Sequence, residues 1–561
     1  MDSQTQKRFK VWQWRTIIVT MLGYAFFYFV RKNFSFAMPG LAAEYGISNT
    51  SFGLILAIVG LIYGFSRFFN GILADRINAR YHMSLGLLLC ALASIAFGFV
   101  PQLLGIEIGV APHSLVVAFA ILLVLNNIFQ GSGFPPCARL LSHWIPPQEL
   151  ATKMSIWNTS HSIGASVLAI LCGFIMVTMG TNISNDNEAV EKITYNYVSK
   201  NFKDDVKKSS HHIAKIDSIE IVEQENNGYL VYVDYTYRSN YEEGKSVRTE
   251  YNFSHDNFLA VQKAMEGKKD IGATELAAKC NIPEPQAKAL QSIVSRSEHT
   301  GAWRWCFWIP GIIALVSAFG LFIFLRDTPK SVGLPELEMT KTALDNESNN
   351  DPASCRAYVR KMVYKNPIIW ILSTAYFFVY IVRFSVLDWG PKFLIEARNM
   401  TFEEAAYAVS AFEIMAIVGT LVAGWVTDKI FDGKAHRTCL WCMVGTALFM
   451  TIFYFLPNDS EPMILICVLA MAGFFIYGPQ ALIGIAAANH ATKKAAATAN
   501  GLVGIFGYLS VFVSGLGVGV LVDHFGWNYV FIGMIAMAVI GAIIFLAIWN
   551  VGRDGYDRAN S

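Results

Sequence analysis

The chain has 561 residues, of which 54% are hydrophobic and 15% are charged, and its formal net charge is +2. A soluble protein of this length could hardly solvate such a composition, so the sequence indicates a membrane protein that crosses the bilayer several times. The composition therefore excludes an ordinary soluble protein.

Twelve apolar runs follow one another along the chain, each long enough for about 20 helical residues, the length that spans a bilayer. They are centred near residues 25, 61, 91, 126, 165, 314, 380, 415, 446, 474, 511 and 538. Lysine and arginine gather in the segments KRFK, DRINAR, DKIFDGKAHR and ATKK, whereas two loops on the opposite side contain neither residue. Basic loops face the cytoplasm, so both termini are predicted to be cytoplasmic, and the lack of a compact cleavable signal predicts that the first helix remains as an anchor.

Residues 181–300 form a polar stretch between the fifth and sixth runs, with 19 acidic and 15 basic residues. The segments SIEIVEQ and YLVYVDYTY, joined by the turn ENNG, predict a hairpin of two strands, and helical patterns follow at FLAVQKAM, ATELAAKC and EPQAKALQSIVSR. The order of the spans places this small module outside the cell. An acidic, outward-facing module lacks the basic surface that nucleic acid requires, although ATELAAKCNIPEPQAKAL resembles a helix-turn-helix. Its role in stability, in assembly or in docking a protein partner stays open.

Arg31 and Arg383 are the most informative residues, because each interrupts a long apolar run. An arginine at membrane depth costs about 2.5–3.5 kcal/mol on insertion scales, so two of them suggest a bound anion or a partner carboxylate. Arg31 precedes Asp75 by 44 residues and Arg383 precedes Asp428 by 45, and both acids lie in a repeated loop pattern. The chain is therefore predicted to contain two related halves, each with one arginine inside the membrane.

The repeated pattern reads GILADRINAR after the second run and GWVTDKIFDGKAHR after the eighth. Acidic and basic residues at helix ends can hold two helices together in one conformation and release them in another. An ordinary solvated turn would not explain why the pattern recurs at the same place in both halves. The candidate gating residues are Asp75, Arg76, Arg80, Asp428 and Lys429.

This pattern resembles the signature loop of the major facilitator superfamily. The resemblance implies an all-α membrane protein with twelve transmembrane helices in two six-helix bundles, around a central cavity that opens alternately to each side of the membrane. The predicted division is 1–180 for helices 1–5, 181–300 for a small soluble α+β insertion, 301–327 for helix 6, 328–365 for a cytoplasmic linker and 366–561 for helices 7–12.

Longer motifs narrow the resemblance, namely YFVRKNFSFAMP, YGFSRFFNGILADR, GFPPCARLL, SIWNTSHSIGA, VYIVRFSVLDWGPKFL, YGPQALIG and GIFGYLS. Together they resemble the bacterial organophosphate:phosphate antiporters, which include carriers of glycerol 3-phosphate and hexose 6-phosphate. The segments LGYAFFYFVRK, CARLL, FEIMAIVGTLVAGW and GPQALIGIAAA are more similar to the hexose-phosphate transporter and sensor branch. The resemblance implies a bacterial inner-membrane carrier that exchanges hexose 6-phosphate for inorganic phosphate without a cofactor.

The chemistry of phosphate agrees with this resemblance. A phosphate monoester is a compact dianion, and the planar fork of arginine donates two parallel charge-assisted hydrogen bonds to it. In the family, the residues that match Arg31 and Arg383 hold the phosphate. The alternative, that each arginine is paired with a carboxylate, has a candidate in Asp388, five residues after Arg383.

Further polar residues in the apolar runs complete the predicted substrate site. The family residue that matches His161 lines the phosphate site, although a lone buried histidine is more often a satisfied hydrogen-bonding residue. Arg67 keeps a positive charge where the glycerol-phosphate transporter has lysine, and whether it touches substrate or faces an acid stays open. Tyr28 and Tyr380 each lie three residues before an arginine, on the same helix face, and can steady it or bind a phosphate oxygen. Tyr63, on the second helix, is a further candidate.

Several alternative functions stay open at this stage. Glu413 in the eighth run could bind a proton, but exchange needs no proton carrier, because two arginines in an empty site repel each other and disfavour reorientation. A glycerol 3-phosphate antiporter is one alternative, and a receptor that binds hexose phosphate without transporting it is another. A proton-driven symporter of a neutral sugar leaves the arginines unexplained. No arrangement of nucleophile, base and oxyanion donors indicates an enzyme, and the CxxC of Cys439 and Cys442 lacks the further ligands of a metal site.

Overall fold

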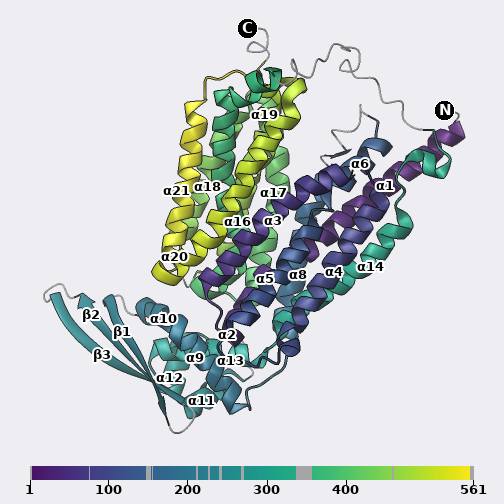
Figure 1. Ribbon diagram of the computed structural model, residues 1–561. Coiled ribbons are helices and arrows are strands. Elements are labelled where there is room, and N and C mark those ends of the chain that lie inside the picture. The colour runs from purple at the N-terminus through teal and green to yellow at the C-terminus, as the bar shows by residue number, and fades with distance from the viewer. Residues whose placement is uncertain are drawn as a thin grey trace.

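The computed structural model describes residues 3–74, 76–146, 153–154, 156–209, 213–224, 228–238, 243–266, 271–335, 357–457 and 460–555. Within these residues, 11 helices are long and apolar enough to cross a membrane. They form two bundles, with a small α+β module at one end (Figure 1). The predicted fold class is therefore confirmed.

The N-terminal bundle contains the helices that precede the insertion and the one that follows it. These are α1 (Ser3–Phe29), α2 (Asn33–Tyr45), α3 (Asn49–Ala74), α4 (Ala79–Leu103), α5 (His113–Gln130), α6 (Phe134–Trp144), α8 (Ser160–Thr178) and α14 (Ala302–Phe324). The C-terminal bundle contains α16 (Pro367–Arg398), α17 (Phe402–Lys429), α18 (Ala435–Phe455), α19 (Pro462–Phe512), α20 (Val518–Phe525) and α21 (Trp527–Ala547). Helix α19 holds two of the predicted spans, which meet at Thr492, where the backbone leaves the helical region with φ of 61°.

The first predicted span is not one continuous helix. It is divided into α1 and α2 at residues 30–32, and neither helix is among the 11 that are long and apolar enough to cross a membrane. The amide groups of Arg31 and Lys32 both donate to the carbonyl of Tyr28, at 3.2 and 3.1 Å, which closes a turn before α2 begins. The break therefore lies at the two cations that interrupt the apolar run.

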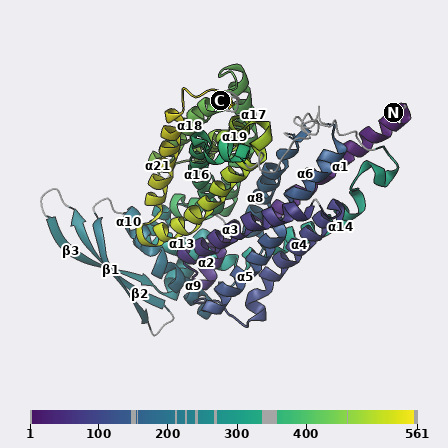
Figure 2. The same ribbon diagram turned by 45° about the horizontal axis from the view of Figure 1, so that its top comes forward.

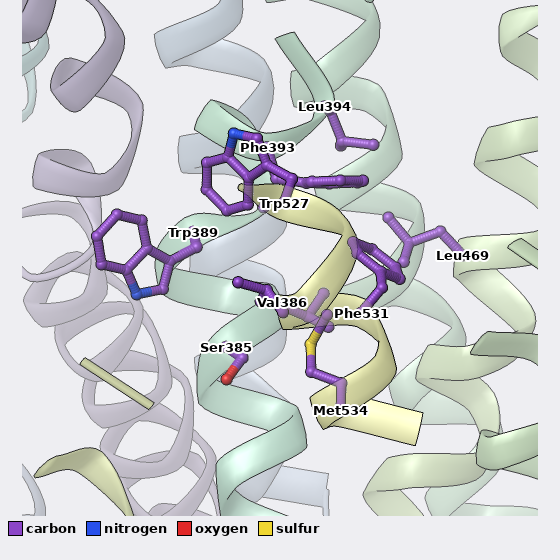
Figure 3. Close-up of a pocket in the computed structure, with 11 residues that line it drawn as sticks. Ser385, Val386, Trp389, Phe393, Leu394, Leu469, Trp527, Phe531 and Met534 are labelled. Carbon is purple, nitrogen blue, oxygen red and sulfur yellow. The ribbon is translucent and has the colours of Figure 1, made fainter. Parts of the chain in front are cut away.

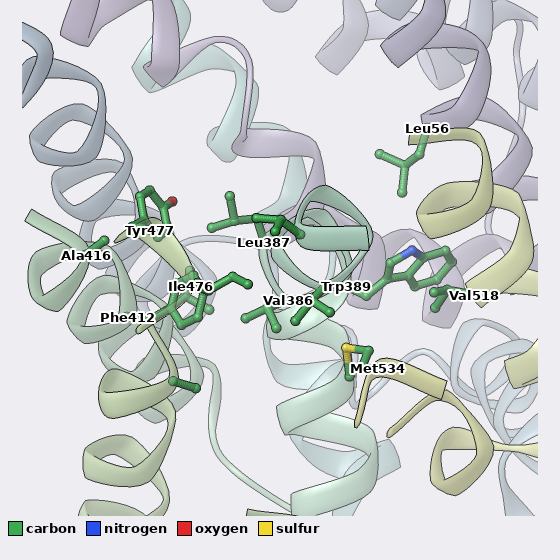
Figure 4. Close-up of a cluster of buried hydrophobic side chains, with 14 of the residues drawn as sticks. Leu56, Val386, Leu387, Trp389, Phe412, Ala416, Ile476, Tyr477, Val518 and Met534 are labelled. Carbon is green, nitrogen blue, oxygen red and sulfur yellow. The ribbon is translucent and has the colours of Figure 1, made fainter. Parts of the chain in front are cut away.

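The two bundles meet through apolar side chains at the end of the molecule that carries the insertion, which we call the insertion end. The ribbons diverge toward the opposite end, where α1 begins and α21 finishes, and we call this the terminal end (Figure 1). Leu56 of α3 belongs to the same buried cluster as Trp389 and Val518 of the C-terminal bundle (Figure 4). This cluster joins the bundles.

Glycines allow the backbones of α3 and the segment 513–525 to approach closely. A Cβ atom at Gly53 would lie 2.5 Å from the carbonyl oxygen of Gly515, and one at Gly519 would lie 2.3 Å from that of Asn49. Real Cβ atoms do not approach so closely, so only glycine fits at these positions. The close contact between these two segments at the insertion end therefore depends on glycine.

A carboxylate of the C-terminal bundle caps the first turn of α3. Asp523 accepts from the backbone amide of Asn49 at 3.2 Å, from its side-chain amide at 2.8 Å, and from the amide and hydroxyl of Thr50, both at 2.7 Å. A negative charge at a helix N-terminus satisfies orphan amides and favours the helix dipole. Asp523 therefore holds the two bundles together at the insertion end.

We expect Asp523→Ala to speed hydrogen–deuterium exchange of the amides at the start of α3 by about tenfold, because hydrogen bonds to a charged acceptor are lost. Peptide-level mass spectrometry over residues 46–53 measures this exchange. Glu461→Gln, an exposed acid at the N-cap of α19 with no side-chain cap bond, is the matched control and should leave the segment unchanged. Equal exchange in Asp523→Ala and wild type would contradict the cap.

The insertion is a three-stranded antiparallel sheet covered by helices, and it projects from the insertion end (Figure 2). Its elements are α9 (Asn187–Lys200), α10 (Phe202–Ser209), β1 (Ile213–Gln224), β2 (Gly228–Arg238), β3 (Glu243–Phe253), α11 (His255–Met265), α12 (Ala273–Cys280) and α13 (Glu284–Glu298). The predicted hairpin is confirmed as β1 and β2, in a register that pairs Glu220 with Tyr232. The prediction missed β3, whose polar residues alternate less clearly with apolar ones.

The insertion has its own apolar core and is attached to the N-terminal bundle. Thr181 and Thr300 form an antiparallel bridge, with N–O distances of 2.8 and 3.1 Å, where the chain enters and leaves it. The side-chain amide of Asn196 donates to the carbonyls of Ala43 at 3.2 Å and Gly109 at 3.3 Å. These bonds tie α9 to the end of α2.

Lys200, at the end of α9, reaches toward the C-terminal bundle. Burial and the charge of Lys392 lower the pKa of Lys200 to about 8, and this outweighs the attraction of Asp523 and Glu396. The folded protein then binds fewer protons than the unfolded chain between pH 8 and the ordinary lysine pKa of 10.5. The contribution of Lys200 to stability therefore rises across that interval.

We expect Lys200→Met to raise the melting temperature at pH 7 by about 1 °C, since the cost of burying the cation is removed. The difference from wild type should shrink as the pH approaches 10. Thermal unfolding in detergent at both pH values measures it. Lys192→Met on the same helix, where the lysine forms an exposed pair with Glu188, is the control. A pH-independent difference would show that the charge of Lys200 has no part in it.

Candidate functional site

Arg31 lies at the break between α1 and α2, half-buried between the bundles. Its guanidinium carbon is 3.7 Å from the centroid of the Tyr63 ring and 5.5 Å from that of Tyr28. Among the described residues, no carboxylate forms an ion pair with it. An aromatic cage holds the cation in place but leaves its charge without an anionic partner.

Arg383 occupies the corresponding place on α16 and is only 5% exposed. Its guanidinium carbon is 4.6 Å from the ring centroid of Tyr477 and 5.6 Å from that of Tyr380. Its Nε atom is buried and has no hydrogen-bond partner. A buried donor without a partner is costly, so this atom is free to bind an acceptor that enters the site.

Glu413 lies near Arg383 but is held by another residue. The hydroxyl of Tyr477 donates to its Oε1 atom at 2.5 Å, while Oε2 is buried without a hydrogen-bond partner. Arg383 and Glu413 interact electrostatically without forming an ion pair. The acid therefore offsets part of the arginine charge and leaves the Nε donor of Arg383 unused.

The two arginines face one region between the bundles. Tyr28 and His161 each interact electrostatically with both Arg31 and Arg383. The rings of Tyr28 and His161 lie 5.7 Å apart. A small anion in this region would meet donors from both halves of the chain.

Asp388 does not pair with Arg383. Its carboxylate forms an ion pair with Lys32, whose side chain is 15% exposed while that of Asp388 is 7% exposed. Five residues along a helix correspond to about 500°, which turns Asp388 to another face than Arg383. The pair joins the N-terminal bundle to the C-terminal bundle, and it leaves both arginines unpaired.

Arg67 makes a further polar contact between the bundles. Its Nη1 atom donates to the hydroxyl of Tyr508 at 2.9 Å, and its guanidinium lies over the ring of Phe134 at 4.4 Å. Tyr508 also packs edge-on against Tyr63, with centroids 5.7 Å apart. Arg67 thus faces a tyrosine and not an acid, and Tyr508 is a site residue that the predicted set lacked.

His161 is placed beside the arginines with one nitrogen in use. Its Nδ1 atom faces the carbonyl of Asn158 and donates to it, whereas Nε2 is buried without a partner. In a neutral ring with Nδ1 protonated, Nε2 is an acceptor. His161 can donate to an anion only when it is doubly protonated, which the approach of a dianion favours.

Other buried cations in the C-terminal bundle are fully partnered. Arg398 donates to the carbonyls of Leu456 at 2.7 Å and Phe453 at 2.6 Å, and Lys392 pairs with Glu396 four residues later. These cations stabilise helix ends within one bundle. The contrast with Arg31 and Arg383 separates structural cations from candidate binding groups.

The repeated loops make equivalent contacts in the two bundles. Arg80 donates through Nε to the carbonyl of Phe322 at 2.5 Å and lies 4.5 Å from its ring centroid. Arg437 donates through Nε to the carbonyl of Trp549 at 3.1 Å and lies 4.7 Å from its ring centroid. Arg80 thus binds the end of the last helix of its bundle, and Arg437 binds a residue just after the last helix of its bundle, which supports the two related halves.

The other predicted gating residues do not form a lock between bundles here. Asp75 lies outside the described residues, and Arg76, Asp428 and Lys429 are exposed. The first loop is instead held by Arg139, which donates to the carbonyl of Ala74 at 2.6 Å and to Asp327 at 3.1 Å. Arg139 lies in the motif GFPPCARLL. The sequence therefore pointed to this residue, although Arg139 was not among the predicted gating residues.

A small apolar pocket lies apart from the arginines, between α16 and α21 (Figure 3). Its labelled lining includes Trp389, Trp527, Phe531 and Met534, with Ser385 as a polar residue. It offers no charged group to a phosphate. The polar cluster around Arg31 and Arg383 is therefore the candidate site.

Two helical bundles that meet around unpaired arginines define the class, a multi-pass membrane protein with a polar site between two related halves. The chain belongs to the Major Facilitator Superfamily, whose sequence profile matches residues 20–183 and 292–515. The unmatched stretch between these segments lies within the insertion. The insertion is therefore an addition to the family fold.

Several curated relatives align with nearly the whole chain. The "Probable hexose phosphate transport protein" of Chlamydia pneumoniae is 30% identical over 97% of this chain and 93% of its own length. The "Glycerol-3-phosphate transporter" of Bacillus subtilis strain 168 is 30% identical over 98% of this chain and 96% of its own. The "Membrane sensor protein UhpC" of Escherichia coli strain K12 is 29% identical over 97% and 93%. These relatives are transporters or sensors and not enzymes, as expected.

Solved structures share the fold at low sequence identity. A bacterial homologue of the human lysosomal transporter Spinster, in an inward-facing and unoccupied conformation, has a TM-score of 0.61 and 12% identity, and the match covers 95% of this chain and 96% of that one. The D-xylose–proton symporter has a TM-score of 0.54 and 14% identity, with coverage of 95% and 97%. The two-bundle architecture is thus that of known transporters.

Proposed function

We propose that this protein exchanges a phosphate monoester, hexose 6-phosphate in the first place, for inorganic phosphate by alternating access. The observation that carries the proposal is the pair Arg31 and Arg383, which face one region between the bundles without a carboxylate of their own. Two guanidinium groups match a dianion in charge and offer it several donors. An enzyme site would need reactive groups that this cluster lacks.

The phosphate is bound by groups from both bundles. Arg31, caged by Tyr63 and Tyr28, approaches from the N-terminal bundle, and Arg383, with its free Nε atom, approaches from the C-terminal bundle. Tyr380, beside Arg383, adds a hydroxyl donor. Binding in this way draws the two bundles toward one ligand, which is the differential interaction that alternating access requires.

Obligatory exchange follows from the charge of the empty site. Without an anion, closing the bundles brings Arg31 and Arg383 together with Arg67 nearby, and Glu413, which interacts with Arg383, offsets only part of that charge. Bound phosphate or ester removes the repulsion, so the loaded carrier reorients and the empty one does not. Protonation of Glu413 is not needed for this cycle.

The substrate class is supported by the names of the relatives, which include carriers of hexose phosphate and of glycerol 3-phosphate. The sequence segments that resemble the hexose-phosphate branch favour the larger ester. We place the protein in the bacterial inner membrane with its terminal end in the cytoplasm and the insertion outside, where a protein partner could dock.

The test is uptake of labelled phosphate into phosphate-loaded proteoliposomes, with competition by glucose 6-phosphate, glycerol 3-phosphate and free glucose. Uptake that is inhibited most strongly by glucose 6-phosphate, and not by glucose, supports the proposal. Stronger inhibition by glycerol 3-phosphate would make that ester the substrate. Inhibition by glucose alone would contradict a phosphate carrier.

A sensor is the second candidate, because one relative of similar identity is named a membrane sensor protein. The same cluster of arginines would then bind hexose phosphate without moving it. Binding of glucose 6-phosphate to the purified protein with no uptake into any loaded vesicle would favour this reading.

A further inference from the structure

Tyr376 lies one helical turn before Tyr380 on α16, on the side of the terminal end. Its hydroxyl donates to the hydroxyl oxygen of Tyr380 at 2.7 Å. The two rings are tilted by 44° with their centroids 4.3 Å apart. Tyr376 also interacts electrostatically with Arg383 and Tyr508, so it borders the same region as the site.

The position of the Tyr376 ring depends on a glycine of another helix. A Cβ atom at Gly507 of α19 would lie 2.7 and 2.9 Å from the Cε1 and Cδ1 atoms of Tyr376, and 3.7 Å from the Cδ1 atom of Tyr380. Any side chain at 507 would push the Tyr376 ring aside. Gly507 thus makes the room in which the two tyrosines pair.

We propose that Tyr376 is a positioning residue that fixes the hydroxyl of Tyr380 as a donor to the phosphate. This inference rests on the proposed function and deepens it, because it names a residue that acts through another. Tyr376 belongs neither to the sequence motifs nor to the predicted site.

The protons of the two hydroxyls determine what Tyr380 can bind. A tyrosine hydroxyl has one proton, and the oxygen of Tyr380 already accepts the proton of Tyr376. The proton of Tyr380 must therefore point elsewhere, and the described residues give it no acceptor. Arg383, whose guanidinium carbon lies 5.6 Å from the centroid of the Tyr380 ring, can only donate. A phosphate oxygen held by Arg383 is the acceptor that completes the chain.

In such a chain of hydrogen bonds, each bond strengthens the other. When Tyr380 donates to an anion, its oxygen becomes a better acceptor for Tyr376, and the two bonds polarise one another. The removal of the Tyr376 hydroxyl would free Tyr380 to turn its own proton toward another group. Phosphate would then lose a donor that is oriented before it binds.

The test is a double-mutant cycle in phosphate-loaded proteoliposomes. We expect Tyr376→Phe to raise the KM for phosphate about threefold to tenfold, the value of one hydrogen bond, with little change in the maximal exchange rate. Tyr380→Phe should raise KM at least as much, and the double variant should equal Tyr380→Phe alone, because Tyr376 acts through Tyr380. Thr374→Val removes a hydroxyl of α16 that bonds only its own helix, and it should leave KM unchanged.

A second variant tests the same inference without removing a hydroxyl. Gly507→Ala should raise KM at least as much as Tyr376→Phe, whereas Gly504→Ala, one turn earlier with open space around it, should not. A Tyr376→Phe variant with wild-type KM, or effects of Tyr376→Phe and Tyr380→Phe that add, would overturn the inference. Wild-type protein that exchanges no phosphate would contradict the proposed function instead.

Discussion

Replacing Arg31 or Arg383 with lysine is expected to lower phosphate exchange by at least about 100-fold in each variant. Lysine keeps the charge but replaces a planar fork with a point charge, so bidentate hydrogen bonding is lost. Each charge-assisted hydrogen bond contributes about 1.5–3 kcal/mol, and the loss of one or two of them gives this factor. Uptake of labelled phosphate by reconstituted protein measures the effect, and equilibrium binding separates lost affinity from lost movement.

The control for these variants is Arg15→Lys. Arg15 lies on α1, which ends two residues before Arg31, and it contacts Trp12 and Phe324 toward the terminal end. It should keep wild-type exchange. If Arg31→Lys and Arg383→Lys also kept exchange within a few-fold of wild type, the arginines would be structural and the phosphate would bind elsewhere.

Neutralising Asp388 should lower the exchange rate by more than tenfold without abolishing phosphate binding. Asp388→Asn leaves the ammonium of Lys32 buried and unpaired between the bundles, and breaking a buried ion pair costs about 3–5 kcal/mol. Because the pair joins the two bundles, the cost falls on the conformations that keep them together. Exchange kinetics and phosphate binding, measured on the same preparation, separate these effects.

Two further variants show whether the charge pair itself matters. Lys32→Gln combined with Asp388→Asn removes both charges and should recover part of the lost rate. Glu396→Gln breaks the pair with Lys392, which lies within α16, and should affect exchange less. A double variant as slow as Asp388→Asn alone would mean that Asp388 acts on substrate directly.

The sequence predicted most of the membrane fold, since apolar runs and basic loops are local properties that a bilayer imposes on any helix. It did not reveal the break at Arg31, because Arg383 interrupts its own apolar run in the same way and α16 nevertheless continues through it. It also missed β3, whose place in the sheet depends on pairing with β2, as in the pair Tyr232 and Glu250. The break at Arg31 and strand β3 therefore depend on tertiary contacts.

The candidate site, too, could be predicted from the sequence only in part. Arg31 and Arg383 stood out because a charge in an apolar run is costly wherever it lies. The pairing of Lys32 with Asp388 could not be predicted, since 356 residues separate them and only the packed bundles bring them together. The dependence of Tyr376 on Gly507 is hidden for the same reason.

The most direct test of phosphate exchange at the two-arginine site is trans-stimulated efflux. Proteoliposomes loaded with labelled phosphate are diluted into buffer with or without glucose 6-phosphate, for wild type and for Arg31→Lys. We predict that label leaves wild-type vesicles when the ester is outside and stays inside when it is absent, and that the variant shows no efflux in either buffer. Equal efflux with and without external ester, or full efflux in the variant, would contradict phosphate exchange at the two-arginine site.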